Sequence, residues 1–268
     1  MSNSKFEYVK AFENHSDLLP NTYIVVRIDG KAFTKFTDTH QFKKPNDIRG
    51  IKVMLLAGLS VMNSFTEIFL GYGQSDEFSF VFKKKAKLYN RRSEKILTNV
   101  VSQFTSAYVY YWNSIFTDMK LQYPPCFDGR IVLYPSFENL KDYFSWRMVD
   151  CHINNLYNTT FWALVTGGMT KAQAHDKLKG TFSKDKNEIL FKDYGINYNN
   201  EPEVYKKGTL LVRLKNNENK SKYPTDELLY KDDPISKAMI FNEQTNVVVC
   251  HSDLVKDDFW NKEIIDFE

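Results

Sequence analysis

This chain of 268 residues has few cysteines, and it lacks long apolar runs and a strong excess of one charge. Its three cysteines, Cys126, Cys151 and Cys250, are odd in number and widely spaced, which fits neither a disulfide framework nor a zinc site. The N-terminal residues lack the apolar core of a signal peptide, and no apolar run is long enough to span a membrane. We therefore expect a soluble intracellular protein of the cytoplasm, the nucleus or both, with no membrane partner.

The net charge of +3 is too small to indicate a nucleic-acid partner by itself, so its distribution matters more. Residues 83–95 contain seven basic side chains and one acidic side chain. A run of this kind is usually a solvated helix face, but it also suits contact with a phosphate backbone, where released counterions provide affinity. The 21 Phe, 16 Tyr and 4 Trp residues are compatible both with a large core and with stacking on bases.

The first half of the chain alternates strand and helix patterns. Residues 22–28 are β-branched and aromatic and end at Asp29-Gly30, which predicts a strand followed by a turn. Residues 47–67 repeat apolar residues at helical spacing after Asn46, a candidate N-cap. Further patterns predict strands at 68–73 and 78–82, a helix over about 89–116 and a strand at 129–135. The order βαββαβ is that of a ferredoxin-like, palm-type antiparallel sheet, so we expect an α+β fold.

From Ser136 onward the pattern becomes mainly helical. Residues 137–165 form one long periodic segment, and shorter helices are expected between Thr170 and Gly180 and between Ser183 and Gly195. Residues 210–214 predict a strand, and the polar residues 215–235 predict a mobile loop. We therefore divide the chain into a part with the βαββαβ pattern, residues 1–135, and a mainly helical part with a polar loop at 215–235, residues 136–268.

Two aspartates are the strongest candidates for a metal site. Asp29 ends the first strand, and Asp76 lies with Glu77 at the tip of the predicted hairpin. In a βαββαβ sheet the first strand is central and adjoins that hairpin, so the two aspartates can be neighbours. Carboxylates plus substrate phosphates suit Mg²⁺, and two such ions can stabilise both oxygens of an in-line displacement at phosphorus. Acids in turns are commonly only solvated, and the palm-like order alone identifies no reaction.

Residues near the first strand are suited to holding a phosphate. Gly30 lets the backbone approach a phosphate or a metal, and Lys31 to Thr34 would begin the next turn with free N–H groups. Lys44 precedes a predicted helix start, where a lysine can reach a triphosphate. A plain turn and a surface lysine are the alternative interpretations.

The segment HINNLYNTTFW, residues 152–162, is unusually rich in asparagine for a helix. It places His152, Asn155 and Asn158 near one helix face. Amides and rings of this kind can read unpaired bases and riboses, although a polar patch packed on another helix would have the same pattern.

Several segments together resemble the eukaryotic histidine-tRNA guanylyltransferases. In chain order they are SKFEYVKAFE (4–13), VVRIDGKAF (25–33), KPND (44–47), YGQSDEFSFVFK (72–83), NRRSEK (90–95), FDGRIVLYP (127–135), DYFSWRMVDCHINNLYNTTFWAL (142–164), KNEILF (186–191) and INYNNEP (196–202). The resemblance runs through about residue 214 and fades beyond it. It implies a polymerase-like palm that adds a single guanylate to the 5′ end of histidine tRNA. Residues 1–135 would then be the palm-like catalytic domain, and residues 136–268 a mainly helical RNA-binding or finger-like region.

The resemblance also implies a reaction in three steps that uses two Mg²⁺ ions. ATP first adenylylates the tRNA 5′-monophosphate. The 3′-hydroxyl of GTP then attacks the activated phosphate and expels AMP, and pyrophosphate is finally removed from the new 5′ end. Histidine tRNA, ATP and GTP are therefore the expected partners, together with further copies of the chain in a homotetramer.

Roles for single residues follow from the matching motifs. Metal ligands would be Asp29, Asp76 and the Gly30 carbonyl, and the catalytic set would be Asp29, Asp76, Glu77, His152, Lys186 and Asn199. Nucleotide contacts would come from Asp29, Gly30, Lys31, Ala32, Phe33, Thr34, Lys44, Ser75, Asp76 and Lys95. RNA contacts would come from Arg27, Arg92, Lys95, Arg130, His152 and Asn155. Ala32 departs from the family, whose members often carry a polar residue at this position.

Three other functions share parts of this pattern. A nucleotidyl cyclase or a template-dependent 3′-to-5′ tRNA repair polymerase would use the same paired acids. A non-catalytic tRNA-binding protein descended from such an enzyme would have lost a metal-binding carboxylate, whereas Asp29 and Asp76 are both present.

Overall fold

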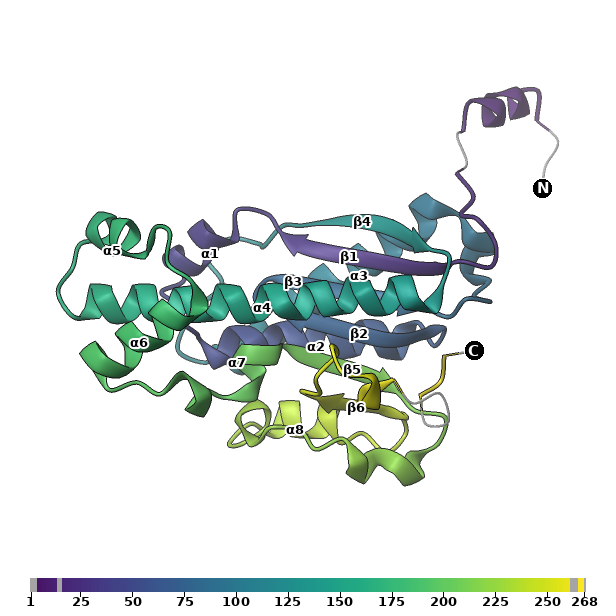
Figure 1. Ribbon diagram of the computed structural model, residues 1–268. Coiled ribbons are helices and arrows are strands. Elements are labelled where there is room, and N and C mark those ends of the chain that lie inside the picture. Colours follow the sequence, from purple (N-terminus) through teal and green to yellow (C-terminus); the bar gives the residue numbers. More distant parts are fainter. Residues whose placement is uncertain (1–3, 14–15, 261–264, 268) are drawn as a thin grey trace.

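One antiparallel sheet organises the chain, in which the computed structural model describes residues 4–13, 16–260 and 265–267. Its six strands lie in the order β4-β1-β3-β2-β5-β6 (Figure 1). They are β1 (Tyr23–Gly30), β2 (Ile68–Gln74), β3 (Glu77–Phe82), β4 (Phe127–Tyr134), β5 (Thr209–Arg213) and β6 (Val247–Cys250). Within the described ranges, no helix has the length and apolar character that crossing a bilayer requires.

The first four strands and their helices form the predicted βαββαβ unit. After β1 come α1 (Phe33–Thr39) and α2 (Ile48–Ser64), and α3 (Ser93–Ile115) connects β3 to β4. Both α2 and α3 cover one face of the sheet, where alternate residues of β1 and β3 point toward them. These inward residues are Ile24, Val26, Ile28, Phe78, Phe80 and Phe82. The predicted α+β fold with a ferredoxin-like sheet is therefore confirmed.

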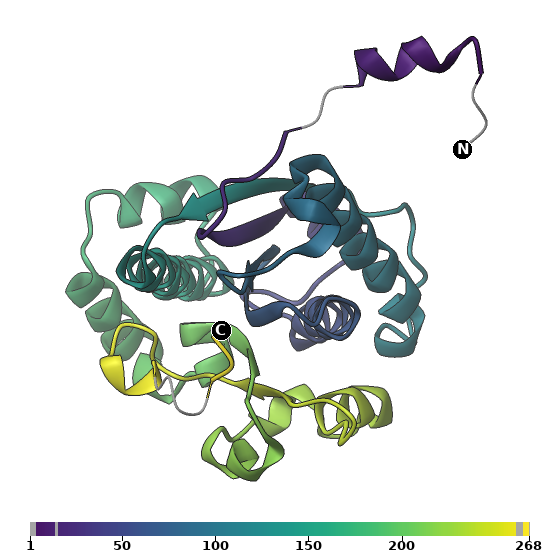
Figure 2. The same cartoon turned by 90° about the vertical axis from the view of Figure 1, so that its right-hand side faces the viewer.

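The opposite face is covered by α4 (Phe137–Thr166), a helix of 30 residues (Figure 2). Ser136 caps it by accepting a hydrogen bond from the Asn139 N–H, as predicted. Tyr143, Phe144 and Met148 of α4 belong to the core on this face. Because both faces are covered, every residue of β3 is buried.

Three short helices follow α4 and pack against its C-terminal half. They are α5 (Lys171–Leu178), α6 (Ser183–Tyr194) and α7 (Glu203–Lys207). Thr170 and Gln173 form a capping box at α5, and Gly195 ends α6 with a left-handed φ of 66°. Both helices therefore lie between the residues predicted to flank them. The exception is the start of α6, where Phe182 is the N-cap residue and Ser183 is the first helical residue.

The last third of the chain extends the same sheet. Strand β5 confirms the strand predicted at 210–214, whereas β6 was not predicted. Residues 215–235, expected as a loop, include two short 3₁₀ helices and lead into α8 (Pro234–Ile240). Leu229 of this segment is fully buried, and the Thr225 hydroxyl donates to the Val249 carbonyl over 2.7 Å. The short 3₁₀ helices of the chain are Glu7–Phe12, Leu88–Arg91, Tyr198–Asn200, Asn217–Lys222, Glu227–Leu229 and Asp257–Phe259.

Two helix starts differ from the prediction. Asp47, not Asn46, caps α2, because its carboxylate accepts the hydrogen bond from the Arg49 N–H. Helix α3 begins at Ser93, not near residue 89, because Tyr89, Asn90 and Arg91 all have positive φ angles. Most of the basic run 83–95 therefore lies in the connection that precedes α3 and not along the helix.

Candidate active site

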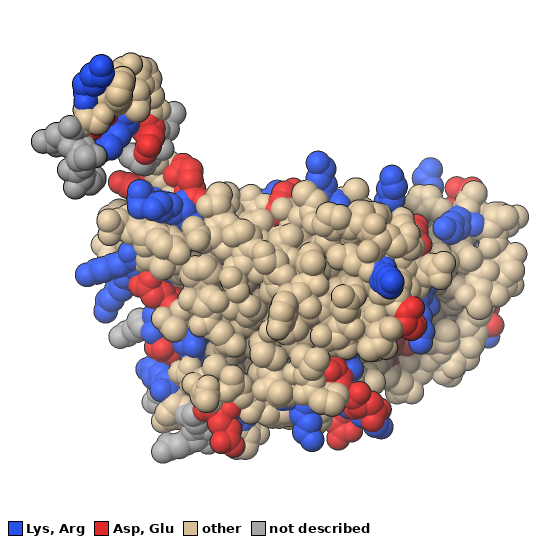
Figure 3. Space-filling model, turned by 180° about the vertical axis from the view of Figure 1, so that it is seen from behind, with Lys and Arg blue, Asp and Glu red and all other residues tan. Residues whose placement is uncertain are grey.

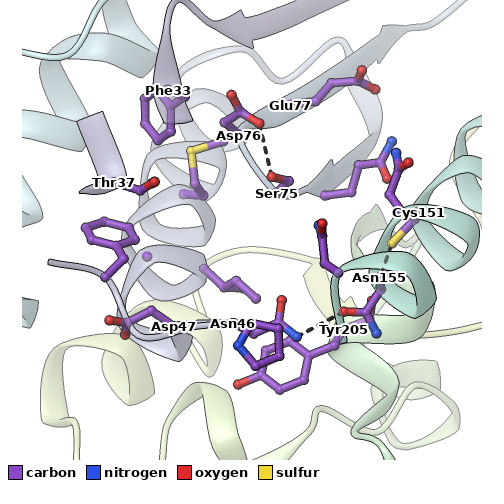
Figure 4. A pocket seen from close by; sticks show the side chains of 18 of the residues that line it. Phe33, Thr37, Asn46, Asp47, Ser75, Asp76, Glu77, Cys151, Asn155 and Tyr205 are labelled. Atoms are coloured by element: carbon purple, nitrogen blue, oxygen red, sulfur yellow. Dashed lines mark hydrogen bonds between the residues drawn. The ribbon is translucent and has the colours of Figure 1, made fainter. Parts of the chain in front are cut away.

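A pocket of about 860 Å³ lies where β1 ends and β2 turns into β3. Its walls come from both halves of the chain: α1, the start of α2 and the β2–β3 turn on one side, and α4, α5 and α7 on the other. Figure 4 shows Ser75 and Asp76 on one side of this space and Asn46, Asn155 and Tyr205 on another. The volume is within the usual range for small-molecule sites.

The structure brings Asp29 and Asp76 to the same wall of this pocket. Asp29 pairs with Glu77 across β1 and β3, and the Gly30 N–H donates to the Asp76 carbonyl over 3.1 Å. Asp76 occupies the two-residue turn with Ser75, whose φ is 49° and whose hydroxyl donates to the Asp76 carboxylate over 3.0 Å. Burial raises the pKa of Asp76 and the charge of Asp29 raises it further, while the Ser75 hydrogen bond lowers it.

Gly30 is required by the close approach of these groups. A Cβ atom at this position would lie 2.8 Å from Oδ2 of Asp76 and 2.4 Å from the Phe33 ring. The expectation of free N–H groups after Gly30 is wrong for Lys31, whose N–H donates to the Cys126 carbonyl over 2.8 Å. Ala32 has a left-handed φ of 54°, a conformation that alanine rarely adopts. Phe33 and Thr34 line the pocket, while Lys31 and Ala32 are outside its lining.

Glu77 is held by α4. Its Oε1 accepts a hydrogen bond from Nε of Arg147 over 2.9 Å, and the two side chains are only 12% and 8% exposed. A second nitrogen of Arg147 donates to Asp150 over 2.6 Å. Burial raises the pKa of Glu77, and Arg147 opposes this effect. Sequence reasoning missed Arg147, although its position among Phe144, Met148 and the other buried residues of α4 was a visible signal.

Asn155 joins α4 to the segment before α2. Its carbonyl oxygen accepts from Nδ2 of Asn46 over 2.9 Å, and its amide donates to the Tyr198 hydroxyl over 3.0 Å. Asn46 is thus a bridge to α4, which explains why it does not cap α2. This contact fixes Lys44 and its neighbours at the rim of the pocket.

Basic and aromatic side chains form the part of the pocket farthest along α4. The ammonium groups of Lys44 and Lys171 lie 5.8 and 5.4 Å from the centre of the Trp162 ring. Lys44 also forms a 3.0 Å ion pair with Asp38, and the Tyr157 hydroxyl lies 2.7 Å from Nδ1 of His175. Trp162, Lys171 and His175 were not singled out from the sequence, because the turn between α4 and α5 decides that they meet.

Three of the predicted catalytic residues are outside the lining of this pocket. His152 lies on the exposed side of α4, 5.6 Å from the Tyr198 ring, and burial with Lys206 nearby lowers its pKa. Lys186 of α6 donates to the Thr181 carbonyl over 2.8 Å. The carbonyl of Asn199 accepts a 2.8 Å hydrogen bond from Lys206. The structure therefore groups these residues around α4 but not with the aspartates.

The four predicted basic contacts also lie outside the pocket. Arg27 and Arg130 are directly opposite each other across β1 and β4. Arg92 and Lys95 lie at the start of α3, next to the beginning of β1 and far from its Asp29 end. The structure does not bring these two pairs to the nucleotide-sized cavity of a single copy of the chain.

Comparisons with known proteins decide the family. The chain matches the tRNAHis guanylyltransferase family model over residues 6–135 and the Thg1 C terminal domain model over residues 138–256. It is 50% identical over 262 residues to a tRNA(His) guanylyltransferase of Schizosaccharomyces pombe, covering 97% of this chain and 96% of the relative. The chain belongs to the tRNA(His) guanylyltransferase family. It is an enzyme of the nucleotidyltransferase class.

Solved structures agree with this assignment. The tRNA(His) guanylyltransferase of Saccharomyces cerevisiae superimposes with a TM-score of 0.75 at 49% identity, covering 78% of this chain and 93% of the other. A bacterial tRNA(His) guanylyltransferase-like protein, in complex with ATP, superimposes with a TM-score of 0.67 at 24% identity, covering 78% of this chain and 89% of the other. This more distant likeness supports the shared fold.

The donor set of the pocket suits a hard divalent cation. Among the described residues, no group of three or more His, Cys, Asp or Glu side chains could hold a metal ion by itself. Asp29 and Asp76 offer oxygen donors only, and a cation bound beside them would offset the burial and the charge of Asp29, which raise the pKa of Asp76. Mg²⁺ needs few protein carboxylates, because substrate phosphates and water complete its coordination. The residues present therefore fit Mg²⁺ together with a bound nucleotide.

Proposed function

We propose that this enzyme adds one guanylate to the 5′ end of histidine tRNA, using ATP and GTP. The observation that carries the proposal is the Asp29–Asp76 pair in a pocket of about 860 Å³ within a tRNA(His) guanylyltransferase fold. Related proteins in complex with ATP and with GTP support the nucleotide substrates. We further propose that residues 1–135 provide the chemistry and that residues 136–268 bind RNA.

The proposed reaction has three balanced steps. An oxygen of the tRNA 5′-phosphate attacks the α-phosphorus of ATP, the bond to the β-phosphate breaks, and pyrophosphate leaves. The 3′-oxygen of GTP then attacks the activated 5′-phosphorus, its proton is lost, and AMP leaves. Water finally attacks the new 5′-triphosphate and releases pyrophosphate, leaving a 5′-monophosphate.

The side chains of the pocket would position these groups. Asp29, Asp76 and the Gly30 carbonyl would hold two Mg²⁺ ions, which when bound stabilise negative charge on the attacking and leaving oxygens. Ser75 fixes the Asp76 carboxylate by its 3.0 Å hydrogen bond. Lys44 and Lys171 flank Trp162 and would contact the triphosphate at the opposite end of the pocket.

Glu77 has a different role in this proposal. Because Arg147 neutralises it within the core, Glu77 positions the start of β3 and does not itself bind the metal. His152, Lys186 and Asn199 cluster around α4 outside the pocket, and we propose that they contact the RNA substrate with Asn155. Arg27 and Arg130 would contact the RNA backbone beside the 5′ end.

We also propose that four copies of the chain assemble and that the enzyme acts inside the cell. An uncharged helix face supports the assembly: α3 has no Lys, Arg, Asp or Glu from Ile96 to Ile115, and Tyr110 is 77% exposed. Figure 3 shows a broad face with few charged side chains. A second copy would also offer its Arg92 and Lys95 to the pocket of the first.

The transfer reaction tests the proposed function. Histidine tRNA with a 5′-monophosphate is incubated with ATP, labelled GTP and Mg²⁺, and the native chain is compared with Asp76→Ala. We expect label at the tRNA 5′ end only with the native chain. Folded native protein that leaves intact tRNA unlabelled would contradict the proposal.

The same assay separates the other functions. A cyclic product from GTP without RNA would identify a nucleotidyl cyclase. Equal transfer to many 5′-truncated tRNAs under the control of a template base would identify a repair polymerase. Tight tRNA binding without turnover, unchanged by Asp76→Ala, would identify a non-catalytic RNA-binding protein.

A further inference from the structure

A second cavity lies at the end of the sheet opposite to the aspartates. It has a volume of about 380 Å³, and Lys84, Lys85 and Lys215 all line it. Its remaining lining residues are uncharged: Asn21, Tyr23, Phe137 and Phe267. The three lysines come from two segments about 130 residues apart in the sequence, so the fold itself brings them together.

The described residues neutralise the lysines of this cavity poorly. Lys84 lies 5.6 Å from the centre of the Tyr23 ring and donates to the Pro135 carbonyl over 3.2 Å. The neighbouring Asp266 is already paired with Lys83 over 2.7 Å. Lys85 and Lys215 are exposed and form no ion pair with any residue that the structure describes. Such a group attracts an anion.

Aromatic side chains form the base of the cavity. The Phe137 ring lies 6.2 Å from that of Tyr23 and 4.9 Å from that of Phe267. Lysines beside ring faces are the combination with which proteins bind unpaired nucleotides: cations hold the phosphate and rings contact the base. A cavity of this volume is at the lower end of the range for small-molecule sites, which suits one nucleotide unit.

A second feature connects this cavity to the aspartates. Arg27 and Arg130 face each other directly across β1 and β4, and Arg130 forms a 3.5 Å ion pair with Asp128. Nε of Arg27 is buried and has no hydrogen-bond partner among the described residues. On β1, residues 23, 27 and 29 share one face, so the two arginines lie between the lysine cavity and Asp29.

The distance between the two sites requires a long ligand. Tyr23 and Asp29 are six residues apart on β1, which corresponds to about 20 Å at roughly 3.3 Å per residue. Phe137 and Asn154 line the two cavities and are 17 residues apart on α4, which corresponds to about 26 Å at roughly 1.5 Å per residue. No nucleoside triphosphate spans such a length, whereas a tRNA does.

We propose that the Lys84–Lys85–Lys215 cavity is a second RNA-binding site, which holds a backbone phosphate and its nucleotide while the 5′ end lies at Asp29 and Asp76. This inference rests on the proposed function, since it takes tRNA as the substrate. Arg27 and Arg130 contact phosphates between the two sites. The basic run 83–95 thereby acquires a role in holding RNA through its first residues.

The dependence of tRNA affinity on salt concentration tests this site. We compare the full chain with the Lys85→Gln/Lys215→Gln variant and with a control, Lys120→Gln/Lys237→Gln, which removes two exposed lysines outside both cavities. Loss of the contact with this one phosphate lowers the slope of log K against log salt by about 0.7–0.9, and the control leaves it unchanged. Equal urea midpoints of all three proteins verify that folding is intact.

A short RNA hairpin tests whether the RNA must reach from the aspartates to the lysine cavity. It carries the same 5′ end on a stem too short to reach 20 Å, and we expect the Lys85→Gln/Lys215→Gln variant to bind it as the native chain does. Equal slopes for the variant and the native chain on full tRNA would overturn the inference, as would equal loss on hairpin and tRNA. Weaker binding of ATP or GTP by the variant would instead identify a nucleotide site and also overturn it.

The outcome is independent of the proposed chemistry. A native chain that shows the lysine-dependent slope but transfers no guanylate would refute the proposed function and retain this site. A native chain that transfers guanylate while the variant keeps the native slope would refute only this site.

Discussion

The charged groups at the two ends of the central sheet differ in their burial. At the end that carries Asp29, charged groups are packed close together and largely withdrawn from water: Asp76 beside Asp29, and Glu77 against Arg147. At the other end, Lys85 and Lys215 stand exposed at an open cavity. Buried charge with a perturbed pKa is typical of chemistry, whereas exposed lysines are typical of salt-dependent RNA contact.

Asp76→Asn should have the largest effect of any single change. Loss of one preorganised charge from the pocket is expected to lower guanylyl transfer by on the order of 10²–10³-fold. The same variant should unfold at a higher urea concentration above pH 5 without metal, because the raised pKa of Asp76 means that its ionised form destabilises the native state. Urea titration at pH 7.5 with chelator measures this. A variant that is inactive and also less stable would indicate a structural role for Asp76.

Arg147→Met should damage the fold more than the chemistry. It removes the ion-pair partner of the largely buried Glu77 carboxylate, at an expected cost of about 3–5 kcal/mol of unfolding free energy. The matched double variant Arg147→Met/Glu77→Leu removes both charges and should recover most of that loss. The free energy of unfolding in urea measures both. If the double variant were as unstable as Arg147→Met, the pairing account would be refuted.

Gly30→Ala should show the effect of packing alone at the Asp29 end of the sheet, because it changes no charge. The added methyl group would lie against Phe33 and Oδ2 of Asp76, and we expect a loss of about 1–3 kcal/mol in stability. Transfer activity should fall further than stability explains, because the Asp76 carboxylate must move. Single-turnover rates at a temperature where the variant is fully folded measure this. Native rates would show that the position of Asp76 tolerates such a shift.

His251 should give the smallest effect, a pH dependence of stability. Its Nδ1 lies 2.6 Å from the Gly208 carbonyl, and burial lowers its pKa below the ordinary value near 6.5. Below pH 6.5 the unfolded chain therefore binds a proton that the native imidazole resists, so stability falls as the pH decreases. Urea midpoints at pH 7.5 and 5.5 should differ less for His251→Asn than for the native chain. An equal difference would exclude His251 as the source.

The sequence predicted most of the palm and the aspartate pair for a simple reason. Asp29-Gly30 and Ser75-Asp76 interrupt long apolar strands, and the βαββαβ order then decides that these interruptions are neighbours. Strand β6 could not be predicted because VVVC has only four residues and pairs with residues of β5 that lie 34 to 40 positions earlier. This pairing is a long-range contact that no local sequence pattern indicates.

The rest of the pocket depends on contacts between distant segments. Arg147 meets Glu77 from a position 70 residues away, and Asn46 bonds Asn155 across 109 residues. Lys171 reaches Trp162 only because the chain reverses between α4 and α5. The lysine cavity likewise joins Lys84 to Lys215. Contacts between residues so far apart in the chain leave no local pattern from which the sequence could predict them.

A single-turnover assay tests the division between the two ends most directly. Adenylylation of 5′-monophosphorylated histidine tRNA is followed with ATP and Mg²⁺ but without GTP, for the native chain, Asp76→Asn and Lys85→Gln/Lys215→Gln. We predict that Asp76→Asn forms almost no adenylylated tRNA at any tRNA concentration. The lysine variant should reach the native rate but require more tRNA for half-saturation. A lysine variant that fails at saturating tRNA, or an Asp76→Asn variant that needs only more tRNA, would contradict this account.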